Sequence, residues 1–447
     1  MSKKIILFLS DFKENALEQL YTCPDGSQVM GTQTNEAPVN YLLQAHPDVT
    51  EVLCIVTPAA QRTLPALEAA VKVQSPKVSV SAVPFEDGED FSAGPLAQIM
   101  AAVKKGDEIL LETTGGLRDA VMQLLLVSRA LSFSGIPTAG AVYANFGARK
   151  IVDCSRLIGL FDLVGGMQEL ASFGSVYTLR AYYGQQAEPE IDALLSAMER
   201  LNEDITLCRT RKMDQRIEAF NAAMERAEHC ADPLVRALLP AFRAKFGKKL
   251  NIPGLIRWCI NSDMLQQALT IYKERIPAYI LENREDLVKV IPRDLMTDRA
   301  VEAMDKMLAG KKDYETAEEV LFRSLLNLGR MLRYQYYDPD NDRWTADPAV
   351  LTLENLDDLA DRSYHFIVRC PMDQLRDIIM DYQYIRMLRN MINHANEQGS
   401  PSQQELMDYL SGFGYKPLDQ AGARDIKDTL ERALRNLNTR PKKERKR

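Results

Sequence analysis

The sequence is short of the residues that build metal sites and disulfides. It has only four histidines, and its seven cysteines are scattered without a CxxC pair. His46, His229 and His365 lie far apart, with no cysteine, aspartate or glutamate at the spacing of zinc ligands. We therefore expect no metal site, and we expect reduced, buried cysteines in a cytoplasmic protein.

Long hydrophobic runs and two common nucleotide-binding signatures are also missing. The apolar run near the start, Ile5–Leu9, ends at Ser10 and is too short for a signal peptide or a membrane span. No GxGxxG follows it, and neither GxxxxGKS nor GxxxxGKT occurs in the chain. These absences argue against membrane insertion, an NAD-type dinucleotide enzyme and a P-loop NTPase.

Composition and charge are those of an ordinary globular protein. The 447 residues are 46% apolar and carry a net charge of −7, and the chain is long enough for two or three domains. The negative charge argues against a surface coated with basic residues for nonspecific nucleic-acid binding. It remains compatible with a local basic site.

Strand and helix patterns alternate through the first 180 residues. Several of the strand-like runs are apolar at nearly every position, as expected for strands covered on both faces. Repeated strand–helix units predict a parallel, doubly wound sheet that binds ligands beyond the carboxyl ends of its strands. The predicted strands are 5–9, 52–57, 78–83, 108–114 and 139–144, and the predicted helices are 36–45, 59–73, 95–104 and 117–133.

Helical periodicity dominates from about residue 181 to residue 440. We expect an all-α region there, followed by a disordered basic tail over 441–447. The segment Tyr337–Ala349, rich in aspartate and proline, is expected to be a polar turn region between helices. The predicted helices include 189–209, 263–282, 316–337 and 372–397.

Polar residues gather where the predicted strands end. The strand 108–114 runs into TTGG, whose glycines allow close approach of a ligand, and the helix that follows has free N–H groups that favour an anion. Arg118 adds a guanidinium for a phosphate or a base edge, and Asn35 is a predicted N-cap. Capping or turn geometry explains each residue alone, but together they favour a site for nucleotide hydroxyls, bases and phosphates. The predicted ligand-binding residues are Ser10, Asp11, Gln33, Thr34, Asn35, Thr57, Thr113, Thr114, Gly115, Gly116 and Arg118.

The predicted helix 372–397 carries the sequence RNMINH. Asn390 and His394 are four residues apart and share a face, whereas Arg389 lies about 140° around the helix from His394. Histidine can exchange a proton near neutral pH, arginine can stabilise a phosphorane-like transition state, and asparagine can orient either group. This set suits RNA cleavage without a metal, although a surface arginine and histidine are often only solvated. Apolar residues at helical spacing are expected to form one buried stripe: Leu375, Ile378, Ile379, Tyr382, Ile385, Leu388, Ile392 and Ala395.

These motifs, in this order, resemble the ancillary ribonucleases of type III CRISPR systems. In those proteins a CARF domain, a Rossmann-like sensor of cyclic oligoadenylate, precedes a HEPN ribonuclease domain. Arg389, Asn390 and His394 are similar to the R-x(4–6)-H signature of HEPN domains. TTGGLRD and the QTNEA segment after Gly31 resemble CARF loops, and residues 258–277 resemble the helical region of these proteins.

The resemblance implies a fold of the class α/β plus all-α, with a CARF domain over 1–180 and a helical region containing the HEPN domain over 181–440. It implies a homodimer that binds one cyclic tetra- or hexa-adenylate and pairs Arg389 and His394 from two subunits. The implied activity is metal-independent cleavage of single-stranded RNA by 2′-OH attack, which leaves a 2′,3′-cyclic phosphate. No other cofactor is implied.

Other functions remain open at this point. A non-enzymatic, cyclic-oligoadenylate-sensing regulator would need a winged helix-turn-helix, which the long helical array does not favour. A metal-dependent nuclease would need a PD…(D/E)xK set, which we do not find in the C-terminal half. The sequence does not distinguish the two ring sizes, oligomers beyond a dimer, the RNA base preference, or slow cleavage of the ring through Thr114 or Asn35.

Overall fold

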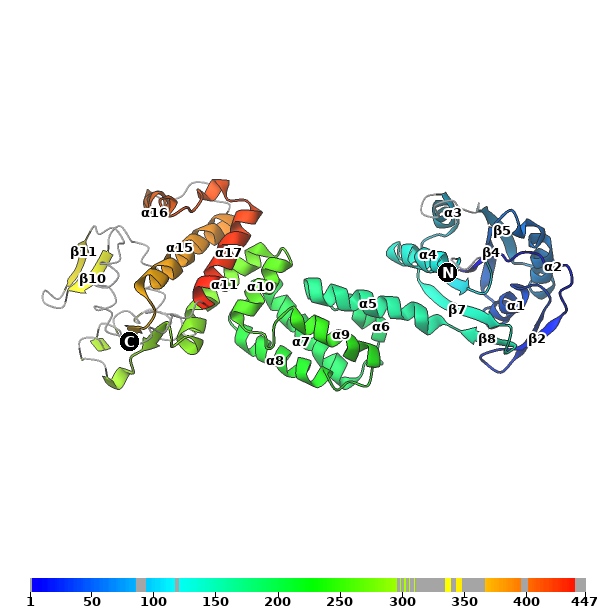
Figure 1. Ribbon diagram of the computed structural model, residues 1–447, viewed down its shortest axis with the longest axis horizontal. Helices are drawn as coiled ribbons and strands as arrows, with labels where there is room; N and C mark the ends of the chain where they lie inside the picture. Colours follow the sequence, from blue (N-terminus) through cyan, green and yellow to red (C-terminus); the bar gives the residue numbers. More distant parts are fainter. Residues whose placement is uncertain are drawn as a thin grey trace, which may run out of the picture. The chain divides into compact units, whose positions relative to one another are not determined.

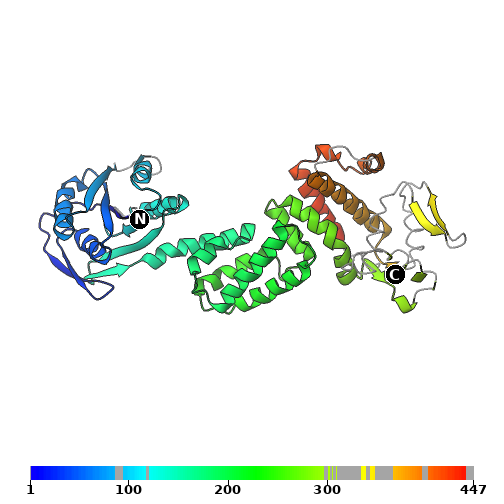
Figure 2. The same cartoon turned by 180° about the vertical axis from the view of Figure 1, so that it is seen from behind.

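The computed structural model describes residues 2–85, 94–116, 120–295, 334–338, 343–347, 366–394 and 401–438, with a few single positions between 298 and 309. The chain folds into two compact units, Met1–Gly165 and Gly166–Arg447 (Figures 1 and 2). The first unit is α/β and the second is mainly α-helical, so the predicted fold class is confirmed. The division falls within one long helix; the functional domain limits 1–180 and 181–440 stay a prediction.

The first unit is an eight-stranded sheet with helices on both faces (Figure 1). Its elements in chain order are β1 (Lys3–Phe8), β2 (Gln19–Thr22), β3 (Gln28–Gly31), α1 (Glu36–Ala45), β4 (Val49–Val56), the 3₁₀ turn η1 (Ala60–Arg62), α2 (Leu64–Gln74), β5 (Ser79–Pro84), α3 (Gly94–Ala102), β6 (Glu108–Glu112), α4 (Ala120–Phe133), β7 (Thr138–Asn145), β8 (Lys150–Asp153) and the start of α5 (Ser155–Phe173).

The order of the strands is that of a doubly wound sheet with additions at one edge. It reads β3-β2-β8-β7-β6-β1-β4-β5, and β5, β4, β1, β6 and β7 run parallel. After β1 the chain forms β2 and β3 at the far edge, adds β4 and β5 on one side of β1, and then crosses back to β6 on the other side of β1. The order therefore reverses between β1 and β6, which is where open α/β sheets bind their ligands.

Two hydrophobic cores cover the two faces of this sheet. Ile5 and Leu7 of β1 point into the core beneath α1 and α2, whereas Ile6 and Phe8 point into the core beneath α3 and α4. This alternation explains why the central strands are apolar at nearly every position. By the same alternation Glu112, which ends β6, shares the face of Leu110, the face that packs against α1.

The sheet is not wholly parallel, so that part of the prediction was wrong. β8 is antiparallel to β7, and β2 and β3 form a hairpin at the edge. These short strands alternate buried and exposed residues and lack an apolar run. The hairpin nevertheless had a turn signal, since Cys23 N–H donates to Ser27 at 2.8 Å around Pro24, Asp25 and Gly26, where φ is +84°.

The second unit is an array of helices with short pieces of strand. Among the described residues, no helix combines the length and the apolar composition needed to cross a membrane. The elements are the rest of α5, α6 (Tyr177–Tyr183), α7 (Pro189–Thr206), α8 (Met213–Ala227), α9 (Pro233–Ala244), α10 (Ile252–Asn261), α11 (Leu265–Asn283), β9 (Val288–Val290), η2 (Arg293–Leu295), β10 (Tyr334–Asp338), β11 (Arg343–Asp347), β12 (Phe366–Val368), α15 (Met372–His394), α16 (Pro401–Ser411), η3 (Leu418–Gln420) and α17 (Ala423–Asn438).

The strands of this unit were not predicted. The expected turn region Tyr337–Ala349 contributes to an antiparallel hairpin of β10 and β11, and β9 pairs with β12. The end of the predicted helix 316–337 is strand rather than helix; most of that helix lies outside the described residues. Aromatic residues and threonine in YQYYD and RWTAD favour strands, and the aspartate and proline between them masked that preference.

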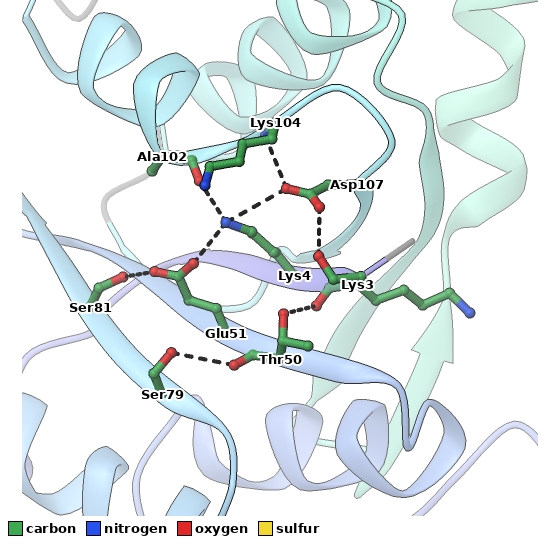
Figure 3. A network of polar contacts seen from close by, with 10 residues as sticks. Lys3, Lys4, Thr50, Glu51, Ser79, Ser81, Ala102, Lys104 and Asp107 are labelled. Atoms are coloured by element: carbon green, nitrogen blue, oxygen red, sulfur yellow. Dashed lines mark hydrogen bonds and ion pairs between the residues drawn. The ribbon is translucent and has the colours of Figure 1, made fainter.

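A buried ammonium group closes the strand-start end of the sheet (Figure 3). Lys4 Nζ donates to Glu51 Oε2 at 2.8 Å and to the Ala102 carbonyl at 2.6 Å, and lies 3.6 Å from Asp107 Oδ2. Although burial raises the pKa of Glu51, the hydrogen bonds from Lys4 and Ser81 lower it overall. The network joins β1, β4 and the end of α3, at the edge of the sheet opposite the predicted ligand site.

Replacing Lys4 with methionine should destabilise the first unit. The substitution leaves Glu51 and Asp107 without their cation, so we expect the free energy of unfolding to fall by about 3 kcal/mol. The control Lys72→Met removes an exposed pair with Glu68 and should cost less than about 1 kcal/mol. Urea unfolding measures both, and similar small losses would show that the network stabilises no more than a surface ion pair.

Candidate functional site

The predicted ligand-binding residues meet at the carboxyl ends of β1, β4 and β6 and at the start of α1. We call this group the strand-end cluster; it comprises Ser10, Gln33, Thr34, Asn35, Thr57, Glu112, Thr113, Thr114, Gly115 and Gly116. Two predicted members fall outside it. Asp11 is exposed and makes no contact that places it in the cluster, and Arg118 lies outside the described residues.

Asn35 is the centre of the cluster, with 1% of its surface exposed. Its Oδ1 accepts from Ser10 N–H at 2.9 Å, and its Nδ2 donates to the Phe8 carbonyl at 3.0 Å and to Glu112 Oε2. Asn35 stands at the N-cap position of α1, as predicted, but its side chain makes no capping hydrogen bond. Instead it joins the end of β1 to the end of β6 across the point where the strand order reverses.

Glu112 is a member of the cluster that the sequence reasoning missed. It is completely buried, its Oε2 accepts from Asn35, and its Oε1 accepts from Thr114 N–H at 2.6 Å. Burial raises the pKa of this carboxyl group from 4.5 to about 7, against the lowering effect of those hydrogen bonds. The available signal was an acidic residue at the end of an otherwise apolar strand, EILLE.

The two positions after β6 require glycine for different structural reasons. A Cβ on Gly115 would lie 2.3 Å from Asn35 Nδ2, 2.3 Å from the Phe8 carbonyl and 2.8 Å from Ser10 Oγ, so no side chain fits there. Gly116 has a φ of +90°, which favours glycine, and its N–H donates to Ser10 Oγ at 3.3 Å. The backbone of this turn therefore packs directly against the end of β1 and the loop that follows it.

Threonine side chains of the cluster differ in whether their hydroxyls are occupied. Thr113 Oγ1 donates to the Val142 carbonyl at 3.0 Å, and Thr114 Oγ1 accepts from Ala144 N–H at 2.8 Å, so both tie β6 to β7. Thr57 Oγ1 accepts from the N–H of Ala60, the first residue of η1, at 3.2 Å.

Thr34 is the exception. It is 92% buried at the start of α1, and its hydroxyl has no hydrogen-bond partner. Gln33, beside it, exchanges two 3.0 Å hydrogen bonds with the backbone of Lys13 and so fixes the loop after β1. The cluster thus combines a fixed backbone with one buried hydroxyl that makes no hydrogen bond, which is uncommon for a buried polar group.

The second candidate site lies at the end of α15. Arg389 and Asn390 are half-buried, and Arg389 Nη1 lies 3.5 Å from Asn390 Oδ1. His394 is the last residue of the helix, and its side chain lies outside the described residues. Of the predicted stripe, Ile392 is 38% exposed rather than buried, Ala395 is not described, and the other six residues are buried.

Asn393 is a further residue at this site that the sequence reasoning did not select. Its amide lies between Arg389 and Gln266 of α11, 3.1 Å from the Gln266 amide nitrogen. With its oxygen turned to the guanidinium, it accepts from Arg389 Nε at 2.9 Å and from Nη2 at 3.3 Å. The spacing of four residues between Arg389 and Asn393 was the signal, since it places both on one helix face.

A buried carboxylate anchors α15 two turns before Arg389. Asp381, with no exposed surface, accepts from Tyr415 Oη, from Arg432 and from Asn436 Nδ2, each at 2.8 Å. The Arg432 guanidinium also lies over the Tyr415 ring, 4.3 Å from its centre. α15 lies alongside α11 and α17 (Figure 2), and this network fixes its position against α17.

One solved structure similar to this chain is Csm6 of Enterococcus italicus bound to cyclic hexa-2′-fluoro-hexa-dAMP. The two chains are 12% identical, with a TM-score of 0.37, over 98% of this chain and 94% of that one. No protein-family model and no curated protein matches. Within the described residues, no group of three or more histidine, cysteine or acidic side chains is arranged to hold a metal ion.

Adding one methyl group at Gly115 tests whether the strand-end cluster is as tightly closed as these contacts indicate. Gly115→Ala should displace Asn35 or Phe8 and lower the free energy of unfolding by about 1–3 kcal/mol. Gly147→Ala is the control, because its Cβ would meet only Asn145 Oδ1 at 3.7 Å, and it should change stability by less than about 0.5 kcal/mol. Thermal unfolding of both variants measures the difference. Equal stability of the two variants would mean that a methyl group fits at Gly115.

Proposed function

We propose that this protein is a cyclic-oligoadenylate-activated endoribonuclease of type III CRISPR defence. The observation that carries the proposal is the pairing of two motifs in one chain. TTGG lies at the point of strand-order reversal in a Rossmann-like sheet, and RNxxxH ends a helix of the helical unit. Each motif alone is weak, and their order matches the CARF and HEPN domains that the sequence resembles.

The strand-end cluster is suited to bind a cyclic oligoadenylate. Such a ring presents phosphates, ribose hydroxyls and base edges, which are recognised by backbone N–H groups, amides and hydroxyls. The start of α1, the exposed Gly116 and the unpartnered Thr34 hydroxyl supply these groups at one edge of the sheet. Arg118, close in sequence, is proposed to contribute a cation for the phosphates.

RNA cleavage is assigned to Arg389, Asn390 and His394. The 2′-OH of the RNA attacks the adjacent phosphorus and the 5′-oxygen leaves, so that the products are a 2′,3′-cyclic phosphate and a 5′-hydroxyl. His394 would exchange the proton with one of these oxygens, and Arg389 would stabilise the charge of the transition state. No step of this mechanism requires a metal ion.

A homodimer is part of the proposal. A ring lying across a two-fold axis would contact both sensor units, and two copies of α15 would pair their arginines and histidines in one composite site. Activation requires that the ring bind the active arrangement more tightly than the inactive one. A change from 1:99 to 99:1 needs about 5.5 kcal/mol of differential affinity.

The free hydroxyl of Thr34 gives a test of the sensor. Thr34→Val removes a buried hydroxyl that has no partner in the ligand-free protein, so it should not lower the free energy of unfolding. Affinity for the activating ring should fall about 5-fold to 10-fold, since a lost hydrogen bond costs about 1 kcal/mol. Thr270→Val, at another buried and unpartnered hydroxyl but on α11, is the matched control and should bind normally. Calorimetric titration with cyclic tetra- and hexa-adenylate measures both variants, and unchanged affinity in Thr34→Val would remove Thr34 from the site.

The nuclease is tested with a fluorescent single-stranded RNA reporter in EDTA, with cyclic tetra-adenylate, cyclic hexa-adenylate or no ligand. We expect cleavage with one ring only. Arg389→Ala and His394→Ala should each lower the rate at least about 100-fold. Arg376→Ala, which changes another arginine of α15, should retain the rate within about 3-fold.

The outcomes separate the competing functions. Ring binding without cleavage in a folded dimer would favour the non-enzymatic sensor. Cleavage that requires a divalent metal, or that survives His394→Ala, would place the active site elsewhere. Cleavage without any ring would show that the sensor does not control the nuclease.

A further inference from the structure

The burial of Glu112 needs a chemical explanation, because burying an ionised carboxylate costs free energy unless a cation is paired with it. Its partners are both neutral N–H donors, Asn35 Nδ2 and Thr114 N. Among the described residues no lysine, arginine or histidine forms an ion pair with it. It lies directly beneath the loops that are proposed to bind a polyanionic ring.

The titratable neighbours do not supply the missing charge. Cys54 of β4 and Cys154 before α5 interact electrostatically with Glu112, and burial raises the pKa of Cys54 to about 12 and that of Cys154 above its ordinary value, so both stay neutral. The charged side chains of adjacent elements have other partners: Lys13 lies over Phe146, Glu36 accepts from Thr32 N–H, and Arg129 pairs with Asp162.

We propose that Glu112 is the positioning residue of the strand-end cluster and that an anionic ligand binds there together with one proton on this carboxyl group. The proposal rests on the function assigned above, since it takes the ligand to be a ring of phosphodiesters. The ionised carboxylate holds Asn35 and Thr114 N–H in the ligand-free protein. When a phosphate approaches, a proton from solvent neutralises Glu112. The hydrogen bonds that Glu112 accepts from the two N–H donors weaken, and one of these donors becomes available to the phosphate.

The sign of the resulting pH dependence follows from the pKa of Glu112, which is about 7 in the ligand-free protein. A nearby phosphate raises that pKa further, so the bound state holds more protons than the free state. Affinity is therefore full below about pH 7 and is lost as the pH rises toward the pKa of the complex. Over the pH range in which the complex holds this proton and the free protein does not, affinity falls by up to about tenfold per pH unit, so we expect a fall of about 10-fold between pH 6.5 and 8.5.

Calorimetry on the wild-type protein tests this without any variant. Titration with the activating ring in buffers of different ionisation enthalpy counts the protons taken up, and we expect roughly half a proton per site at pH 7, where Glu112 is about half ionised. Dissociation constants from pH 6.5 to 8.5 should rise about 10-fold. Binding without proton uptake and without pH dependence would overturn the proposal.

Two variants assign the proton to Glu112. Glu112→Gln keeps the size of the side chain but cannot titrate, so both the proton uptake and the pH dependence should vanish. Glu108→Gln, at the other end of β6 beside Lys3, should leave both unchanged. Uptake that persists in Glu112→Gln, or that disappears in Glu108→Gln, would assign the proton to a different group.

Ligand-free unfolding separates a failure of this proposal from a failure of the proposed function. Because the pKa of Glu112 is raised in the folded protein, wild-type stability should fall as the pH rises from about 4.5 to about 7, and Glu112→Gln should lack that fall. If the fall is present but neither ring binds, the ligand assignment is wrong. If a ring binds and the fall is absent, Glu112 does not titrate as proposed and only the proton linkage is lost.

Discussion

The contact between Asn35 and Glu112 organises the candidate sensor. Asn35 belongs to the start of α1, Glu112 ends β6, and the same amide also reaches the Phe8 carbonyl and the Ser10 N–H after β1. One buried amide therefore connects three segments that are far apart in sequence. Gly115 must lack a side chain because this contact occupies the space above it. The shape of the site is in this sense a consequence of one pair of polar groups.

The same contact that positions these segments also has a free-energy cost. Burying a carboxylate without a cation disfavours its charge, which is why the pKa of Glu112 rises to about 7. The carboxylates at the opposite edge are treated differently, since there the Lys4 ammonium group lies between Glu51 and Asp107 and compensates part of their charge (Figure 3). The carboxylates at that end of the sheet have a buried cation beside them, whereas Glu112, at the end proposed to bind ligand, forms no ion pair with a described residue. A buried carboxylate of this kind is typical of functional sites.

The helical unit uses a buried carboxylate for a structural purpose. Asp381 is satisfied by Arg432, Tyr415 and Asn436, so that α15 is fixed against α17 two turns before Arg389. The last turn of the helix is more exposed, and Asn393 holds the Arg389 guanidinium there. A helix held in place in this way is a suitable support for the proposed cleavage site.

Sequence periodicity was sufficient for the class of fold and for the central elements. Apolar runs such as Ile5–Leu9 predicted central strands because burial on both faces leaves an unmistakable pattern, and helical spacing predicted α7, α11 and α15. The short strands β2, β3 and β8 and the hairpin of β10 and β11 were not predicted, since short strands without an apolar run carry little signal in the sequence. Ile392 was misplaced because its burial depends on neighbouring helices rather than on spacing along its own.

The sequence by itself determined which polar residues follow the strand ends, because TTGG and QTNE are local motifs with local signals. Only the tertiary structure decided what those residues do. Asn35 has the sequence of a helix cap, yet its amide bonds to Phe8, Ser10 and Glu112 because parallel strands bring distant segments to one edge. Glu112 gave little sign of importance, because the cost of a buried charge arises only when the surrounding chain has excluded water from it.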